Sequence, residues 1–96
     1  MPYKIEYSPD AEEHLHLLTK REQGMVLDAV DKQLTFQPTA ETRNRKPMRP
    51  NPLAPWELRV GKLRVYYDVE ENIVVVLAIG IKEGNRVRIG KEVIDL

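Results

Sequence analysis

Residues 56–82 read WELRVGKLRVYYDVEENIVVVLAIGIK, and they hold most of the strong strand-forming side chains of the sequence. Apolar and polar residues alternate over 56–60 and 63–69, which is the period of a strand with one buried face. Residues 73–81 are apolar almost without a break, as expected for a strand covered on both faces at the centre of a sheet. Short polar turns at 61–62 and 70–72 separate the three runs. This stretch therefore predicts an antiparallel meander of three strands.

The alternation also assigns the side chains to two faces. The core face should carry Trp56, Leu58, Val60, Leu63, Val65, Tyr67 and Val69. The other face should carry Glu57, Arg59, Arg64, Tyr66 and Asp68. Arg59 and Arg64 are then neighbours across the hairpin, where like charges are destabilising by about 0.2–1 kcal/mol. Either Glu57 and Asp68 neutralise the two arginines in a solvated ladder of ion pairs, or the arginines bind an anion.

The N-terminal part predicts a short strand followed by two helices. Residues 3–7 alternate as a strand, and Ser8-Pro9 is a typical helix start, with serine as the N-cap and proline at the first helical position. A first helix is expected over 9–18. Thr19 and Glu22 form a capping box, so a second helix is expected over 20–36 and ends before Pro38. The two helices form a hairpin whose apolar side can cover the meander.

The rest of the chain is predicted to be largely irregular. Residues 38–55 hold five of the seven prolines and four basic side chains, and a loop of this length is more often functional than passive. A passive connector between helix and sheet is the alternative. Residues 86–89 alternate as a last short strand, and Gly90 begins a tail. The expected fold is a single α+β domain over 1–96, with an antiparallel sheet of four or five strands packed against the N-terminal helix hairpin.

The charge is distributed unevenly along the chain. Residues 1–42 hold four basic and eight acidic side chains, whereas residues 43–96 hold eleven basic and seven acidic ones. Such an asymmetry indicates an anionic partner for the basic half. The N-terminus has neither the basic nor the apolar region of a signal peptide, and the apolar run at 73–81 is too short to span a bilayer. We therefore expect a cytoplasmic protein that does not contact a membrane.

Most familiar catalytic patterns are absent from the sequence. There is no cysteine, no phosphate-binding glycine loop and no zinc-protease motif, and the one serine is expected to cap a helix. His14 and His16 are two apart on a helix and are interpreted as exposed side chains rather than ligands. Glu57 and Asp68 lie among arginines, which lower a carboxyl pKa and disfavour a general acid. No metal or cofactor is expected, and a cluster of arginine, lysine and tyrosine remains.

The whole chain resembles the RelE/ParE superfamily of toxins from type II toxin–antitoxin pairs. The most specific segments are Leu58-Arg59-Val60-Gly61, Leu63-Arg64-Val65-Tyr66-Tyr67 and Ala78-Ile79-Gly80-Ile81-Lys82. The resemblance implies a RelE-like, microbial-RNase-like fold. It also implies a cognate antitoxin protein, and with it a possible toxin–antitoxin hetero-oligomer.

The best-known branch of this superfamily cuts mRNA on the ribosome without a metal. In that reaction the 2′-oxygen attacks the adjacent phosphate, so the site must stabilise a dianionic transition state and protonate the leaving 5′-oxygen. By position, the resemblance implies catalytic roles for Arg59, Arg64 and Lys82. Arg86 or Arg88 is expected to help neutralise the transition state, and Arg88 is the nearest substitute for the C-terminal tyrosine of that branch. The basic residues expected to bind RNA are Arg43, Arg45, Lys46, Arg49 and Lys62.

The sequence departs from the ribonuclease branch in three ways. Glu57 stands where that branch tends to have a lysine, Glu83 where it tends to have an arginine, and no tyrosine follows Tyr67. Two functions of different class therefore stay open. The first is a metal-independent, ribosome-dependent mRNA endoribonuclease that inhibits translation. The second is a non-catalytic toxin that inhibits by binding, as the gyrase-inhibiting branch does, or an inactive member that only pairs with its antitoxin.

Overall fold

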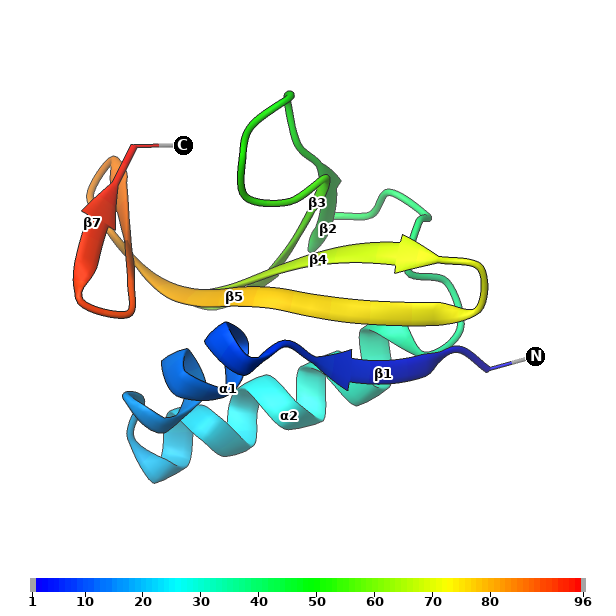
Figure 1. Cartoon of the computed structure of the whole chain (residues 1–96), viewed down its shortest axis with the longest axis horizontal. Coiled ribbons are helices and arrows are strands. Elements are labelled where there is room, and N and C mark those ends of the chain that lie inside the picture. The colour runs from blue at the N-terminus through cyan, green and yellow to red at the C-terminus, as the bar shows by residue number, and fades with distance from the viewer. Residues whose placement is uncertain (1, 96) are drawn as a thin grey trace.

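The computed structural model describes residues 2–95 and shows a sheet with a layer of two helices on one face (Figure 1). In chain order the elements are β1 Lys4–Tyr7, α1 Pro9–His16, α2 Lys20–Leu34, β2 Arg45–Pro47, β3 Trp56–Val60, β4 Leu63–Glu70, β5 Ile73–Glu83, β6 Arg86–Ile89 and β7 Glu92–Ile94. The α+β class, the helix hairpin and the central meander are as predicted. No helix within the described range is long and apolar enough to cross a membrane.

The sheet is larger than the four or five strands predicted. Its seven strands include the path β2-β3-β4-β5-β6-β7, and β1 pairs with β5 in parallel. The prediction missed β2, inside the expected loop, and β7, inside the expected tail. Both have three residues, too few to show an alternation, and β2 contains a proline. The sheet is therefore mixed, because the β1–β5 pair is parallel and the other strand pairs are antiparallel.

The helix layer covers the face that the meander was predicted to bury. Val26, Val30 and Leu34 of α2 are buried against Leu58 and Val65 of the sheet. The predicted caps are present: the Ser8 hydroxyl accepts from the Ala11 N–H at 3.1 Å, and the Thr19 and Glu22 side chains each accept from the other's backbone N–H. The hydroxyl of Tyr67 crosses this core and donates to the carbonyl of Pro38 at 2.6 Å.

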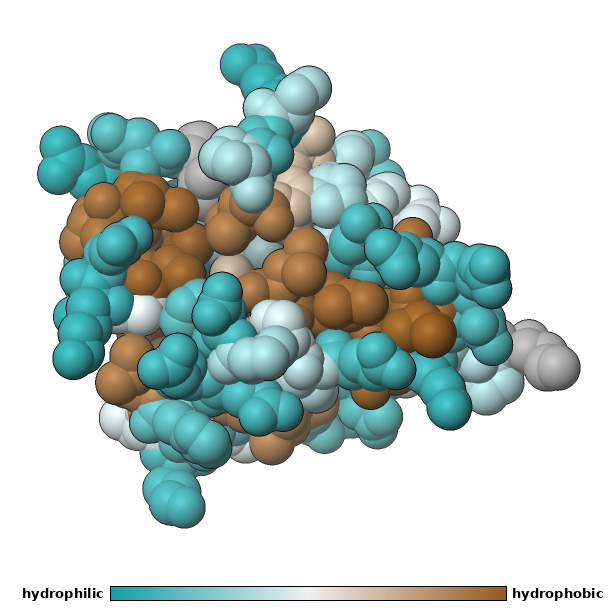
Figure 2. All heavy atoms as spheres, viewed as in Figure 1, coloured by the Kyte–Doolittle hydropathy of each residue, from teal (hydrophilic) through white to brown (hydrophobic). Residues whose placement is uncertain are grey.

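The opposite face of the sheet is not open, which corrects the face assignment in one respect. Tyr66 lies on that face as predicted, but it is completely buried in a second apolar cluster with Ala54, Ala78, Val87 and Ile89. The segment 48–55 rises over this face together with the β6–β7 hairpin (Figure 1). Hydrophobic surface is visible along β4 and β5 and at the β6–β7 hairpin (Figure 2). Both faces of the meander therefore contribute to the core.

One side chain, Asn51, organises the segment 48–55. Its carbonyl oxygen accepts from the N–H groups of Leu53 and Ala54 at 2.7 and 3.0 Å. Its amide donates to the carbonyls of Arg49 and Ala54 at 2.6 and 3.0 Å. Four hydrogen bonds from one side chain hold a proline-rich segment that has few backbone donors of its own. The segment therefore has a defined conformation, held by side-chain hydrogen bonds, rather than being a passive connector.

His14 is not the exposed helix residue that the sequence predicted. It is half-buried, and its Nδ1 accepts from the backbone N–H of Ile79 at 3.2 Å. Along the same edge of β5, β1 pairs up to Val76 and β6 begins at Gly80. Between them, the Ser8 hydroxyl donates to the carbonyl of Leu77 at 3.2 Å. Ser8 and His14 thus fill the interval that neither strand covers.

We expect His14→Ala to destabilise the protein by about 1–3 kcal/mol, because the buried N–H of Ile79 would lose its acceptor. His16→Ala, on the exposed side of the same helix, should change stability by no more than about 0.5 kcal/mol. Urea unfolding followed by circular dichroism measures both. Equal stability of the two variants would show that the His14–Ile79 hydrogen bond does not contribute.

A second matched pair concerns two glycines. A Cβ at Gly80 would lie 2.7 Å from the Arg88 carbonyl oxygen and 2.7 and 2.8 Å from Val87 and Ile89 side-chain carbons, whereas one at Gly24 in α2 would meet nothing within 4 Å. Gly80→Ala should therefore cost about 1–3 kcal/mol through overpacking. Gly24→Ala should stabilise by about 0.5–1 kcal/mol, the usual gain in a helix interior. Thermal unfolding of both variants tests the close approach of β6 to β5.

Candidate RNA-binding groove

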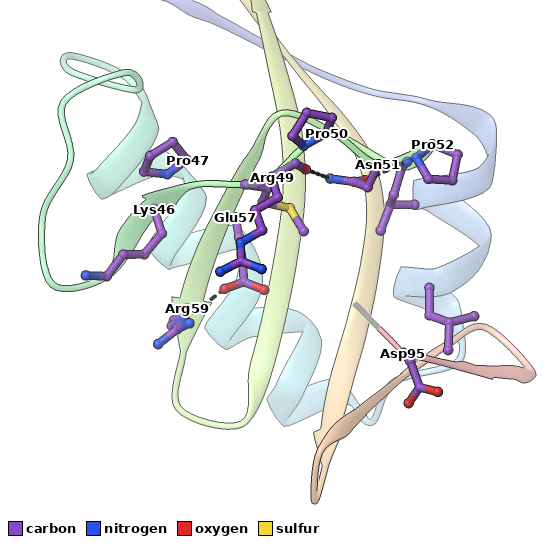
Figure 3. A pocket seen from close by; sticks show the side chains of 12 residues that line it. Lys46, Pro47, Arg49, Pro50, Asn51, Pro52, Glu57, Arg59 and Asp95 are labelled. Atoms are coloured by element: carbon purple, nitrogen blue, oxygen red, sulfur yellow. Dashed lines mark hydrogen bonds and ion pairs between the residues drawn. The ribbon is translucent and has the colours of Figure 1, made fainter.

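A groove of about 900 Å³ opens on the face of the sheet opposite the helices (Figure 3). Residues 46–53 form one wall, Ile94 and Asp95 form the other, and Glu57 and Arg59 of β3 lie between them. The walls are largely apolar, with three prolines, Met48, Leu53 and Ile94. Three cationic side chains also line it: Lys46, Arg49 and Arg59. A groove that combines apolar walls with cations suits single-stranded nucleic acid, whose bases and phosphates need the two kinds of contact.

The cation on the sheet, Arg59, already has an anionic partner. Its Nε donates to Glu57 Oε1 at 2.8 Å, the contact dashed in Figure 3, and both side chains line the groove. Half of the Arg59 side chain is exposed, but only 12% of Glu57 is. Of the two predicted neutralising carboxylates, Glu57 therefore acts as expected. Asp68 instead accepts from the backbone N–H of Val69.

Arg64 lies opposite Arg59 in the strand register, as predicted, but it is not exposed. Only 7% of the residue is accessible, and its Nη1 donates to the carbonyls of Gly61 and Leu63 at 2.7 and 2.9 Å. The guanidinium thereby fastens the β3–β4 turn, where Gly61 adopts a positive φ of 59°. The two arginines therefore do not share one anion, because Arg64 donates to backbone carbonyls and Arg59 donates to Glu57.

Arg45, predicted to bind RNA, is buried in the helix-facing layer. It pairs with Leu58, so both side chains lie on the same face of the sheet, and that face is the core. Its guanidinium donates to the carbonyls of Ala40 and Gln33, the latter in the last turn of α2. A cation at this position complements the negative end of the helix. Arg45 is therefore a buried link between β2 and the end of α2 rather than the accessible cation that the sequence predicted.

The other predicted residues lie in three places. Arg43 is exposed just before β2. Lys62 is exposed at the β3–β4 turn and shares a separate hollow with Arg21 and Met25. Lys82 is exposed on β5, and its backbone N–H donates to the Lys62 carbonyl at 2.8 Å. Because Gly80 pairs with Arg64 and Lys82 is two residues further, Lys82 shares the groove face of the sheet.

Arg86 and Arg88 are not brought to the groove face with Arg59. Val87 and Ile89 alternate with them along β6 and are buried in the cluster around Tyr66, so the two arginines point to the other side. Each has an acidic partner: Arg86 pairs with Asp95 at 3.3 Å, and Arg88 with Glu83 at 3.2 Å. The structure therefore splits the five residues of the predicted catalytic set, and Arg59 and Lys82 are its exposed members on the groove face.

Sequence reasoning missed Tyr66 as a member of the site region. It pairs with Glu57 across the hairpin, and among the described residues its buried hydroxyl has no hydrogen-bond partner. Burial, followed by the negative charge of Glu57, raises the pKa of Tyr66, so the phenol stays protonated near neutral pH. No group of three or more His, Asp or Glu side chains in the described range is placed to hold a metal ion.

Comparison of the sequence with protein-family models and with curated proteins finds no match. Comparison of the structure with solved structures finds three matching chains. A chain of the crystal structure of the toxin–antitoxin complex RelBE2 from Mycobacterium tuberculosis superimposes with a TM-score of 0.74 at 25% sequence identity, covering 85% of this chain and all of the matched one. The chain has a RelE-like toxin fold.

The RelE-like fold accounts for the two layers and the meander. The signals that could have placed the groove are weak in sequence. Met48 and Leu53 lie among prolines, and Ile94 lies in a short C-terminal run. A resemblance over 58–82 fixes the strands that carry Arg59, but it does not say what covers the other face of the sheet.

Arg64 and Arg59 offer a direct test of the two arginine roles. Arg64→Ala should destabilise the protein by about 1.5–3 kcal/mol, because two charge-assisted hydrogen bonds to turn carbonyls are lost from a buried position. Arg59→Ala removes a half-exposed cation and leaves Glu57 with Lys46 and Tyr66 directly opposite it, so it should cost less, about 1 kcal/mol. Chemical denaturation of both variants measures the difference. Little loss of stability in Arg64→Ala would restore the exposed role that the sequence predicted.

Proposed function

We propose that this protein is the toxin of a type II toxin–antitoxin pair and that it acts as a metal-independent, ribosome-dependent mRNA endoribonuclease. The observation that carries the proposal is the groove on the sheet face, where Arg59, Lys46 and Arg49 lie around apolar walls in a RelE-like fold. A matched solved structure that is described as a toxin–antitoxin complex supports the toxin role. The cations supply phosphate contacts, and the apolar walls supply surfaces for unstacked bases.

In this proposal Arg59 is the main phosphate contact. Its guanidinium can offer two parallel donors to a phosphate, and it stabilises the negative charge that develops when the 2′-oxygen attacks. Lys82 adds positive charge from β5 on the same face. Lys46 and Arg49 hold the flanking phosphates along the wall. Arg64 positions the turn that carries Arg59 rather than contacting RNA itself.

A second function, inhibition by binding without cleavage, is favoured by the pairing of the cations. Arg59, Arg86 and Arg88 each have a carboxylate partner, and the buried Tyr66 phenol, with its raised pKa, is a poor proton carrier. A site in this state has positive charge to bind a polyanionic target, but it holds few groups to move protons. An inhibitory toxin needs only the first property.

We also infer an antitoxin partner. The groove places apolar side chains, among them Met48, Leu53 and Ile94, beside the cations Lys46, Arg49 and Arg59. An acidic, partly disordered segment that folds on contact would suit such apolar patches next to basic ones. Co-purification from the native operon should recover the protein with a second chain. Recovery strictly as a single chain would count against the inference.

The functional test is expression in cells of wild type, Arg59→Ala and Arg21→Ala at matched levels, followed by mapping of mRNA 5′ ends. Removing one such charge contact from a phosphoryl-transfer transition state should lower cleavage by about a hundredfold or more. Arg21 lies on the exposed start of α2, so Arg21→Ala matches the change in charge and should cut as wild type does. Full cleavage by a folded Arg59→Ala variant would refute the catalytic assignment. Growth arrest by wild type without cut transcripts would favour the inhibitory binder.

A further inference from the structure

The ion pair between Glu57 and Arg59 has a consequence for any anion that enters the groove. Arg59 Nε donates to Glu57 Oε1 at 2.8 Å, so the carboxylate already occupies one of the guanidinium donors that a phosphate could use. Arg59 is half exposed and can be reached from the groove, whereas Glu57 is nearly covered. A phosphate that binds the Nε side of Arg59 must therefore compete with an internal anion. It also leaves that anion in a poorly solvated position unless the carboxylate finds another donor.

Two donors are directly opposite Glu57: Lys46 on β2, whose Nζ pairs with Glu41 at 3.9 Å, and Tyr66 on β4. Tyr66 is the buried one of the two. Tyr66 and Glu57 are directly opposite each other on β4 and β3, where Cβ atoms are about 4.5–5.5 Å apart, and their side chains share one face. The Tyr66 hydroxyl is buried and, within residues 2–95, has no hydrogen-bond partner, which is unfavourable for a polar group. Burial, the charge of Glu57 and the closeness of its carboxylate as an acceptor raise the pKa of Tyr66, so the hydroxyl keeps its proton. It is available to donate to a carboxylate.

We propose that the Glu57 carboxylate is a counter-ion with two positions, and we call this pair of positions the anion switch. It pairs with Arg59 when the groove is empty, and it turns to accept from the Tyr66 hydroxyl when a phosphate binds Arg59. The proposal deepens the function proposed above, because the natural phosphate would be a phosphodiester of RNA. Glu57 and Tyr66 are then positioning residues. They set how readily Arg59 is released to the ligand, and neither contacts the phosphate.

The alternative is that Glu57 only neutralises the sheet surface. The ion pair of Glu83 with Arg88 provides the comparison, because it has a similar N–O distance, 3.2 Å, and involves the other arginine-rich strand. Both residues of that pair are about half exposed, so solvent replaces either partner at little cost. It also lies away from Tyr66. Glu83→Gln therefore matches the charge change of Glu57→Gln without touching the proposed switch.

The first experiment uses inorganic phosphate, so that it does not depend on RNA cleavage. The Arg59 Nε–H signal is followed by ¹⁵N NMR during a phosphate titration of wild type, Glu57→Gln and Glu83→Gln. Glu57→Gln should bind phosphate about tenfold more tightly at Arg59, because a neutral amide competes less for the guanidinium. Glu83→Gln should stay within about twofold of wild type. An equal gain in both variants would reduce the effect to net charge and overturn the proposal.

The second experiment tests Tyr66 by a double-mutant cycle. Tyr66→Phe should remain folded, since the hydroxyl has no hydrogen-bond partner among the described residues, and circular dichroism with thermal unfolding checks this. It should weaken phosphate binding at Arg59 about three- to tenfold, because the displaced carboxylate loses its second position. In the Glu57→Gln background the same change should have an effect of at most about twofold. Equal effects in the two backgrounds would overturn the switch.

The outcomes separate this proposal from the function on which it rests. A phosphate titration that leaves the Arg59 signal unchanged in all variants overturns the switch, whatever the mRNA 5′ ends show. If wild type leaves mRNA intact but the cycle is as expected, the endoribonuclease assignment fails and the anion switch stands. Repeating the cycle with a single-stranded RNA hexamer should give the same ranking of variants, and a reversed ranking would contradict the proposal.

Discussion

The edge of β5 that faces away from β4 is shared by β1, α1 and β6. β1 pairs in parallel with Ile73–Val76, and β6 pairs in antiparallel fashion with Gly80–Glu83. Ser8 and His14 make the two hydrogen bonds in between. Because a buried backbone group must find a partner, this edge fixes where the first helix lies on the sheet. The position of α1, and with it the helix hairpin, follows from a strand that is more than sixty positions later in the chain.

The other face of the sheet depends on the same strand. At the register shift between Tyr66 and Tyr67, Tyr66 pairs with Ala78 and Tyr67 with Val76, so consecutive tyrosines are both buried on opposite faces. Tyr67 completes the helix-facing core, and Tyr66 becomes the centre of a second cluster under residues 48–55 and the β6–β7 hairpin. That cover raises walls on both sides of β3, and the groove lies between them. The groove exists because the second face of the sheet is only partly filled.

The net charge of zero is reflected in how the cations are used. Arg45 and Arg64 donate to backbone carbonyls, and Arg59, Arg86 and Arg88 pair with carboxylates. A basic stretch in the sequence is thus not the same as a basic surface in the fold. For a RelE-like chain this matters, because binding of a polyanion needs guanidinium groups that a phosphate can reach. Arg59 in the groove meets that requirement at the cost of displacing Glu57.

The sequence by itself determined the meander, the two capped helices and the placement of Arg59 beside Arg64. These features depend on local periodicity and on capping residues, and both involve residues within a few positions of each other in the sequence. The tertiary structure alone decided that β2 and β7 extend the sheet, that Arg45 and Arg64 are buried, and that Arg86 and Arg88 face away from Arg59. It also decided that His14 accepts from Ile79 and that the Tyr66 hydroxyl is buried opposite Glu57 without a hydrogen-bond partner in residues 2–95. Each of these depends on a partner distant in sequence, because burial and hydrogen bonding are properties of what packs against a residue and not of its neighbours in the chain.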